Sequence, residues 1–166
     1  YTEANGMGDQ ARSRTTLAWF RRAPGEHYLF LTGSAKQSQE STVSVPPGLV
    51  RVRIVTQRGA PAFLRLDAVQ PDLVFQNPGS PFVTSNGTHD AIVWVLDENK
   101  PRSAALYGAD APQPVLYAVD AMTMQLLWKS RPGELGPSGK YNEPTIVDGE
   151  VIVGTDRIQA YGLRAR

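Results

Sequence analysis

The sequence contains no cysteine, and this absence removes several kinds of chemistry. Without thiols the chain has no disulfide, no thiolate metal site and no cysteine nucleophile. Only two histidines are present, His27 and His89, and two imidazoles alone do not make a zinc site, which usually needs three protein ligands. His89 precedes Asp90, but adjacent residues of a strand point to opposite faces, so we expect an exposed turn rather than an acid–base pair.

The sequence also lacks long apolar runs and a strong net charge. No apolar run approaches the roughly 20 residues of a membrane-spanning helix, and no stretch has the pattern of a signal peptide. The formal net charge is +1, so no overall electric field points to nucleic acid or to an anionic membrane. We therefore expect no nucleic-acid partner and no membrane-spanning segment.

Turn-forming residues are abundant, while the hydrophobic content is normal. The chain has 15 glycines and 13 prolines, and hydrophobic residues make up 41% of its 166 residues. In the stretch 114–163 the apolar, β-branched and aromatic runs are short, and each is closed by Asp, Gly, Pro or Asn. This pattern is typical of antiparallel strands joined by tight turns, so the sequence predicts an all-β fold.

Several strands are predicted before residue 79. In the first of them we expect Trp19 and Phe20 to lie in the core. A stretch with almost no large apolar residue, 33–48, is predicted to be a surface loop. The predicted strands are 15–22, 27–32, 49–57 and 62–69, with a shorter one at 73–75.

The run 49–57 alternates most clearly. Val50, Val52 and Ile54 occupy one side, and the other side carries Arg51, Arg53 and Val55. A strand has a side-chain period of two, so this alternation predicts a half-exposed strand with one apolar face.

A polar cluster, Asp97, Glu98 and Asn99, follows the predicted strand 91–97. A calcium site needs several oxygen ligands that converge on one point, and three successive residues do not show such convergence. Asp and Asn are common turn formers, so a solvated turn is the favoured interpretation.

The last third of the chain carries the most specific motifs. The run 115–120 is mostly apolar on both faces, which predicts a strand between two layers. It continues into Ala118-x-Asp120-x-x-Thr123-Met124-x-x-x-Trp128, and Glu-Pro-Thr-Ile-Val-Asp-Gly-Glu-Val-Ile-Val-Gly-Thr follows at 143–155. These motifs resemble the PQQ-like repeat of quinoprotein-type β-propellers, whose tryptophan-docking motif is Ala-x-Asp-x-x-Thr-Gly-x-x-x-Trp. Met124 replaces the usual Gly, so we expect no positive φ in this turn.

The resemblance implies an all-β fold of antiparallel blades, forming part of a β-propeller of the PQQ-like repeat type. Residues 1–79 would form less regular β-rich blades, and 80–166 two C-terminal blades of the same propeller domain. Propellers have 4–8 blades of four strands each, and this chain begins with Tyr1, so we expect the C-terminal portion of a longer propeller. The last blade is predicted to be one strand short. The remaining blades would come from the same or another chain.

For the motif residues the resemblance implies structural roles. The indole of Trp128 would stack between neighbouring blades, Asp120 would accept backbone N–H bonds, and Thr123 would add a hydroxyl. We expect this docking motif to serve packing rather than chemistry. A loop that precedes the last blade, containing Lys140, Tyr141 and Asn142, is a candidate partner-binding surface.

Two classes of function follow from the resemblance. The favoured class is a non-catalytic, protein-binding scaffold, exported to the periplasm or the extracellular space, with no predicted catalytic residue, metal or cofactor. The alternative is the C-terminal part of a dehydrogenase that oxidises alcohols or sugars with pyrroloquinoline quinone and calcium. Fold alone does not choose between them.

Overall fold

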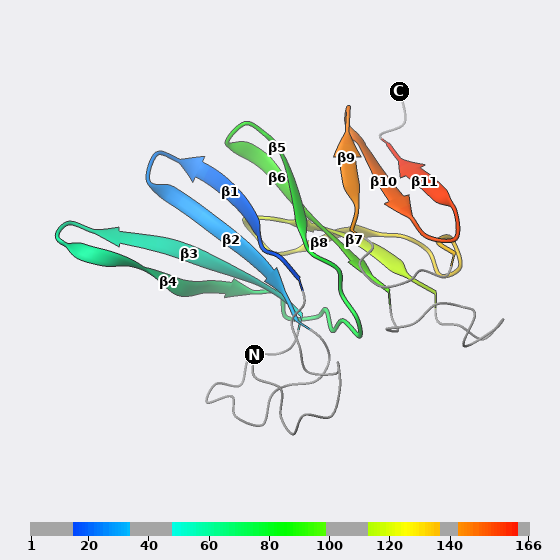
Figure 1. Ribbon diagram of the computed structural model, residues 1–166, viewed down its shortest axis with the longest axis horizontal. Coiled ribbons are helices and arrows are strands. Elements are labelled where there is room, and N and C mark those ends of the chain that lie inside the picture. The colour runs from blue at the N-terminus through cyan, green and yellow to red at the C-terminus, as the bar shows by residue number, and fades with distance from the viewer. Residues whose placement is uncertain (1–14, 34–47, 99–112, 137–142, 163–166) are drawn as a thin grey trace, which may run out of the picture.

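The computed structural model describes residues 15–33, 48–98, 113–136 and 143–162 of the chain (Figure 1). These residues contain eleven β-strands, all in antiparallel sheets, and no helix. The predicted all-β class is therefore confirmed. Among the described residues, no helix has the length and apolar character that crossing a membrane requires.

The strands form three sheets that follow one another along the chain and lie side by side in Figure 1. In each sheet, strands adjacent in sequence are also adjacent in space. The first sheet contains β1 (Ala18–Ala23), β2 (Glu26–Thr32), β3 (Leu49–Gln57) and β4 (Ala60–Val69). The second sheet contains β5 (Phe82–Asn86), β6 (His89–Asp97), β7 (Val115–Asp120) and β8 (Leu126–Lys129). The third sheet contains β9 (Thr145–Val147), β10 (Glu150–Gly154) and β11 (Ile158–Tyr161).

The three sheets repeat one register. Their first strands begin at residues 18, 82 and 145, which are 64 and 63 residues apart. In each sheet, one row of paired positions on one face is filled with apolar side chains. The row is Trp19–Leu29–Val52–Leu66 in the first sheet, Val83–Val93–Val119–Leu126 in the second and Ile146–Val151–Tyr161 in the third.

The hydrophobic core lies between the sheets rather than within one of them. Aromatic side chains of the first sheet pack against valines of the second, and a smaller cluster joins the second sheet to the third. The first cluster includes Phe20, Tyr28, Phe30, Leu49, Val93, Val95 and Val119. The second cluster includes Leu96, Leu116, Leu135, Val151 and Val153. Face-to-face packing of this kind is the main source of stability in layered sheets.

Polar bonds also connect the sheets at matching positions. The backbone N–H of Thr16, just before β1, donates to the Ser80 hydroxyl oxygen, just before β5, over 2.9 Å. The same Ser80 hydroxyl donates to the carboxylate of Glu143, just before β9. Because these residues are again 64 and 63 apart, the entry points of the three sheets are held together by one chain of hydrogen bonds.

Two predictions about the first half of the chain are wrong. The stretch 73–75 is not a strand, because the buried Gln70 side chain accepts the N–H groups of Asp72 and Leu73 and bends the chain there. Leu73 and Phe75 instead fill the core between the sheets. Trp19 is not a core residue either. Its side chain is 55% exposed, while Phe20, on the opposite face of β1, is buried as predicted.

Asp97 and Glu98 do not form a solvated turn. Both are almost fully buried, and Asp97 accepts the backbone N–H groups of Gln76 at 2.9 Å and Asn77 at 2.8 Å. The Asn77 side-chain amide donates to Glu98 over 2.8 Å. These carboxylates bind the connecting segment before β5 to the end of β6. Asn99 lies outside the described residues.

Candidate protein interaction surface

The predicted docking motif forms the β7–β8 turn. One carboxylate oxygen of Asp120 accepts the backbone N–H groups of Met122 at 2.8 Å and Thr123 at 2.6 Å. Backbone bonds from Met124 to Asp120 and from Asp120 to Gln125, both 2.9 Å, close the turn. The Thr123 hydroxyl accepts the N–H of Gln125 at 3.3 Å. Asp120 and Thr123 therefore satisfy backbone donors, as the resemblance implied.

These hydrogen bonds favour the ionised form of the Asp120 side chain. Burial by itself would raise the pKa of this carboxyl, but the hydrogen bonds from Thr123 and Met122 and the nearby charge of Arg51 favour the anion. The pKa of Asp120 therefore lies below its ordinary value of 3.8. The carboxylate is charged at neutral pH and acts as a turn cap.

The expectation about Met124 is wrong. Its φ is +59°, in the left-handed region that normally favours glycine. Met124 is also buried, and its side chain packs in the cluster between the first two sheets. The turn needs a positive φ at this position, and the packing of the thioether offsets the cost of placing a side-chain-bearing residue there.

Trp128 meets the neighbouring sheet along one side. It pairs in register with the buried Ala118, and its ring lies 5.4 Å from the ring of Tyr161 in β11, tilted by 60°. Tilted aromatic pairs at this distance are favourable. Trp128 nevertheless remains 39% exposed. The indole is thus a contact between the second and third sheets at the margin of their core.

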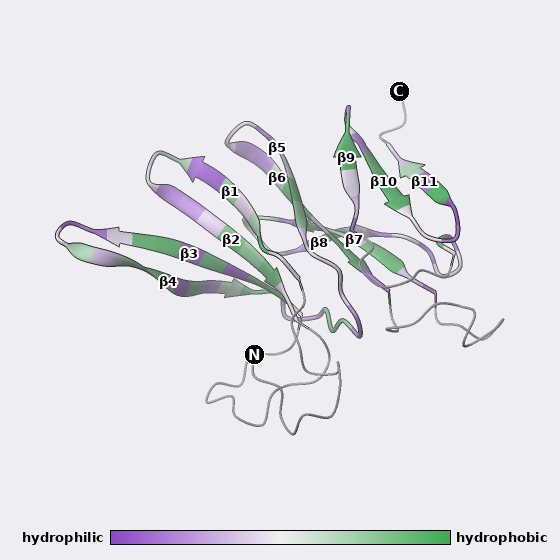
Figure 2. Cartoon of the chain, in the orientation of Figure 1, coloured by the Kyte–Doolittle hydropathy of each residue, from purple (hydrophilic) through white to green (hydrophobic). Residues whose placement is uncertain are grey.

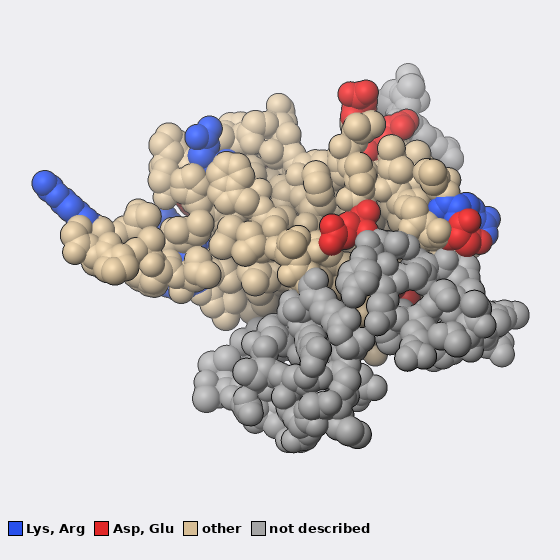
Figure 3. Space-filling view, in the orientation of Figure 1, with Lys and Arg blue, Asp and Glu red and all other residues tan. Residues whose placement is uncertain are grey.

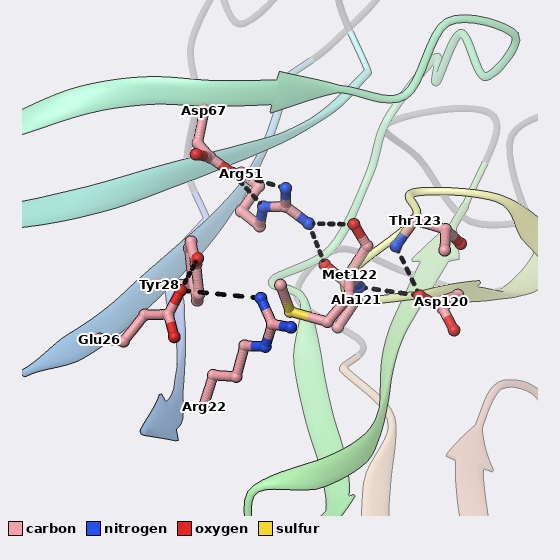
Figure 4. Close-up of polar contacts among 9 residues, drawn as sticks. All are labelled: Arg22, Glu26, Tyr28, Arg51, Asp67, Asp120, Ala121, Met122 and Thr123. Atoms are coloured by element: carbon pink, nitrogen blue, oxygen red, sulfur yellow. Dashed lines mark hydrogen bonds and ion pairs between the residues drawn. The ribbon is translucent and has the colours of Figure 1, made fainter. Parts of the chain in front are cut away.

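Sequence reasoning missed the strongest polar link between the first two sheets. Arg51 of β3 donates to the carbonyl oxygens of Ala121 at 2.7 Å and Met122 at 2.5 Å (Figure 4). It is also paired with Asp67 of β4 at 2.5 Å and lies over the ring of Tyr28, 5.1 Å from its centroid. Arg51 is only 8% exposed. It connects the first sheet directly to the β7–β8 turn of the second.

The burial of Arg51 identifies which face of β3 is inside. The arginine side of the strand faces the second sheet, while Val50, Val52 and Ile54 are half-buried on the opposite, outer face. The predicted strand bounds and alternation are confirmed. The apolar face of β3 is therefore not its buried face. An alternation with a period of two residues does not show which of the two faces is buried.

The outer face of the first sheet is consequently apolar and open. The outer face of the first sheet is the face that carries the Trp19–Leu29–Val52–Leu66 row. Its open part lies over β4, where Leu64 is 60% and Leu66 50% exposed, whereas Leu29 at the centre of the row is only 8% exposed. Figure 2 shows hydrophobic colouring along the neighbouring β3. Large open apolar patches mark interaction sites in soluble proteins. This outer face is the candidate protein interaction surface.

The other candidate residues contribute less. His27 stacks on Trp19 at this face, 5.7 Å between ring centroids, and the Trp19 Nε1–H donates to His27 Nδ1 over 3.3 Å. His89 is exposed at the start of β6. The predicted loop residues Lys140, Tyr141 and Asn142 lie outside the described residues. Within the described ranges, no group of three His, Asp or Glu side chains is placed to hold a metal ion.

In comparisons with known proteins, no family model, no curated protein and no solved structure matches the chain. The class of protein that the fold defines is therefore the broad one: an all-β protein of stacked antiparallel sheets. Any narrower assignment rests on the motifs and the repeated register of this chain.

Proposed function

We propose that this chain is part of a PQQ-like β-propeller that acts as a non-catalytic, protein-binding scaffold outside the cytoplasm. The single observation that carries the proposal is the register repeated in three successive stacked sheets. Propeller blades are successive antiparallel sheets, each of which packs one face on the opposite face of the next. Two of the three sheets described here have four strands, and the third has three. The Ala118–Trp128 turn lies where a docking motif would join one blade to the next.

The polar groups of the repeat support a structural role. Asp120, Arg51 and Ser80 each hold backbone or side-chain partners across or near a sheet boundary. Polar groups whose hydrogen bonds are made within the protein stabilise the stacked sheets, and this favours a structural role for them over substrate binding. The outer face of the first sheet, which in a propeller packs against a further blade of the same or another chain, is the surface through which the scaffold would bind protein.

A site-specific photo-crosslinker tests the scaffold function. It is placed at Leu64 on the outer face and, as a matched control, at Val74, which is 54% exposed in the segment between β4 and β5. We expect a crosslinked protein at Leu64 that is absent at Val74. The captured protein is identified by mass spectrometry and must bind again when purified.

A second assay tests the dehydrogenase alternative. The purified protein is titrated with pyrroloquinoline quinone and calcium, and dye-linked oxidation of alcohols and aldoses is followed. The scaffold proposal expects no saturable quinone binding and no turnover. Oxidation that depends on both additions would overturn it.

A further inference from the structure

We propose that the outer face of the first sheet binds the third sheet of a second copy of this chain, head to tail. The inference rests on the proposed scaffold function and names its partner. The contact between the two copies would have the same geometry as the two contacts between neighbouring sheets within one molecule.

The first argument is the equivalence of faces. In the second sheet, Val93 and Val119 of the apolar row are fully buried because the first sheet covers them. The matching positions of the first sheet are Leu29 and Val52, and their row ends in the exposed Leu66. In the second sheet this row packs against the face of the first sheet that does not carry the row. The row of the first sheet is therefore suited to pack against the corresponding face of another sheet of this repeat.

The third sheet offers that opposite face. Val151 and Val153 of β10 point toward the second sheet and are buried. The alternate positions point away: Ile152 is half-buried, and Val147 and Ile158 are exposed, Ile158 by 81%. One chain therefore carries both halves of such a contact between sheets, and each half leaves apolar side chains exposed, such as Leu66 on the first sheet and Ile158 on the third.

Charge at the ends of the hairpins favours this pairing. The β1–β2, β5–β6 and β9–β10 turns point to the same side of the stack in Figure 1. Arg21 is exposed on the outer face of the first sheet, beside Trp19, and Glu150 is exposed on the open face of the third, beside Ile152. Figure 3 shows acidic side chains over the β9–β10 hairpin and basic side chains over the first sheet. Head-to-tail stacking places these opposite charges together at the rim.

A head-to-tail contact uses two different surfaces, so each copy can lose one and keep the other. Leu64→Lys removes the first-sheet surface, and Ile158→Lys removes the third-sheet surface. Both positions are well exposed, so the folded chain tolerates the lysine, which circular dichroism checks. Val74→Lys is the matched control away from both surfaces.

Sedimentation of the purified chain over a concentration series tests the proposal. We expect the wild type and Val74→Lys to associate, and each face variant to associate at least roughly tenfold more weakly. An equal mixture of Leu64→Lys and Ile158→Lys should form dimers, because one intact boundary remains between unlike partners. Arg21→Glu and Glu150→Arg should each weaken association, and the double variant should recover it.

Three results overturn the inference. One is a wild type that stays monomeric at every concentration. Another is a loss of association in Leu64→Lys but not in Ile158→Lys, which means that two first sheets meet face to face. The third is a mixture of the two face variants that stays monomeric. A monomeric chain that still crosslinks a different protein at Leu64 overturns the second-copy partner and leaves the scaffold function standing.

Discussion

The guanidinium of Arg51 donates a hydrogen bond across a sheet boundary to the carbonyl oxygen of Ala121, over 2.7 Å. Arg51 belongs to β3 of the first sheet, and Ala121 opens the β7–β8 turn of the second. The sequence separates them by 70 residues. This bond joins the first sheet to the β7–β8 turn of the second sheet. The strand that follows this turn carries Trp128, which contacts Tyr161 of the third sheet.

We predict that Arg51→Met lowers the free energy of unfolding by about 2 kcal/mol, since two carbonyl groups lose their buried donor and the part-buried ion pair with Asp67 is removed. Urea denaturation measures the change. Arg53→Met, on the same face of β3 but less buried, is the control and should change stability by less than about 1 kcal/mol. Equal losses in both variants would contradict the bridging role of Arg51.

The stability of the protein should depend on the charge of Asp120. Its folded pKa is lowered, so its stabilising contribution is present above the unfolded value near 3.8 and disappears as pH falls through the folded pKa. At pH 7, Asp120→Asn should be less stable than the wild type by about 1 kcal/mol. The gap should narrow in acid, which urea denaturation from pH 7 to pH 2.5 follows. A gap independent of pH would mean that the charge of Asp120 has no role.

Two substitutions at Met124 separate backbone strain from packing. Met124→Ala keeps the positive φ and loses the buried side chain, whereas Met124→Gly loses the same packing and removes the strain. Both should be less stable than the wild type, by about 2 kcal/mol for alanine. Glycine should be more stable than alanine by about 1 kcal/mol. Thermal denaturation compares them, and a glycine variant no better than alanine would argue against the left-handed turn.

The ring contact between Trp128 and Tyr161 should be measurable as a coupling energy. A double-mutant cycle with Trp128→Leu and Tyr161→Leu should give about 1 kcal/mol of interaction. The same cycle with Leu127→Ala in place of Trp128→Leu is the control, with an expected coupling near zero. No coupling in the first cycle would exclude Trp128 as a contact between the second and third sheets.

The local structure of this chain was largely readable from its sequence. The strand 49–57 was predicted with its observed bounds, and the hairpin of β1 and β2 followed from the Pro-Gly turn between two apolar runs. Asp120 and Thr123 were correctly predicted as turn residues. These features depend on alternation and turn chemistry over a few residues, which the sequence displays directly.

The errors share one cause. Trp19 and Phe20 are equally apolar, yet only Phe20 is buried, and Arg51 is buried while Val52 beside it is half-exposed. Asp97 and Glu98 have the composition of a solvated turn, yet they are buried against the segment before β5. In each case the outcome depends on a segment distant in the chain.

The sequence by itself determined that the fold is all-β and where most of the strands and turns fall, because those properties arise from near neighbours. The tertiary structure alone decided which face of each strand is covered, that Arg51 reaches Ala121 and that Met124 accepts a left-handed backbone. A period of two gives a strand two equivalent faces, and only the sheet that packs against it determines which one becomes the core.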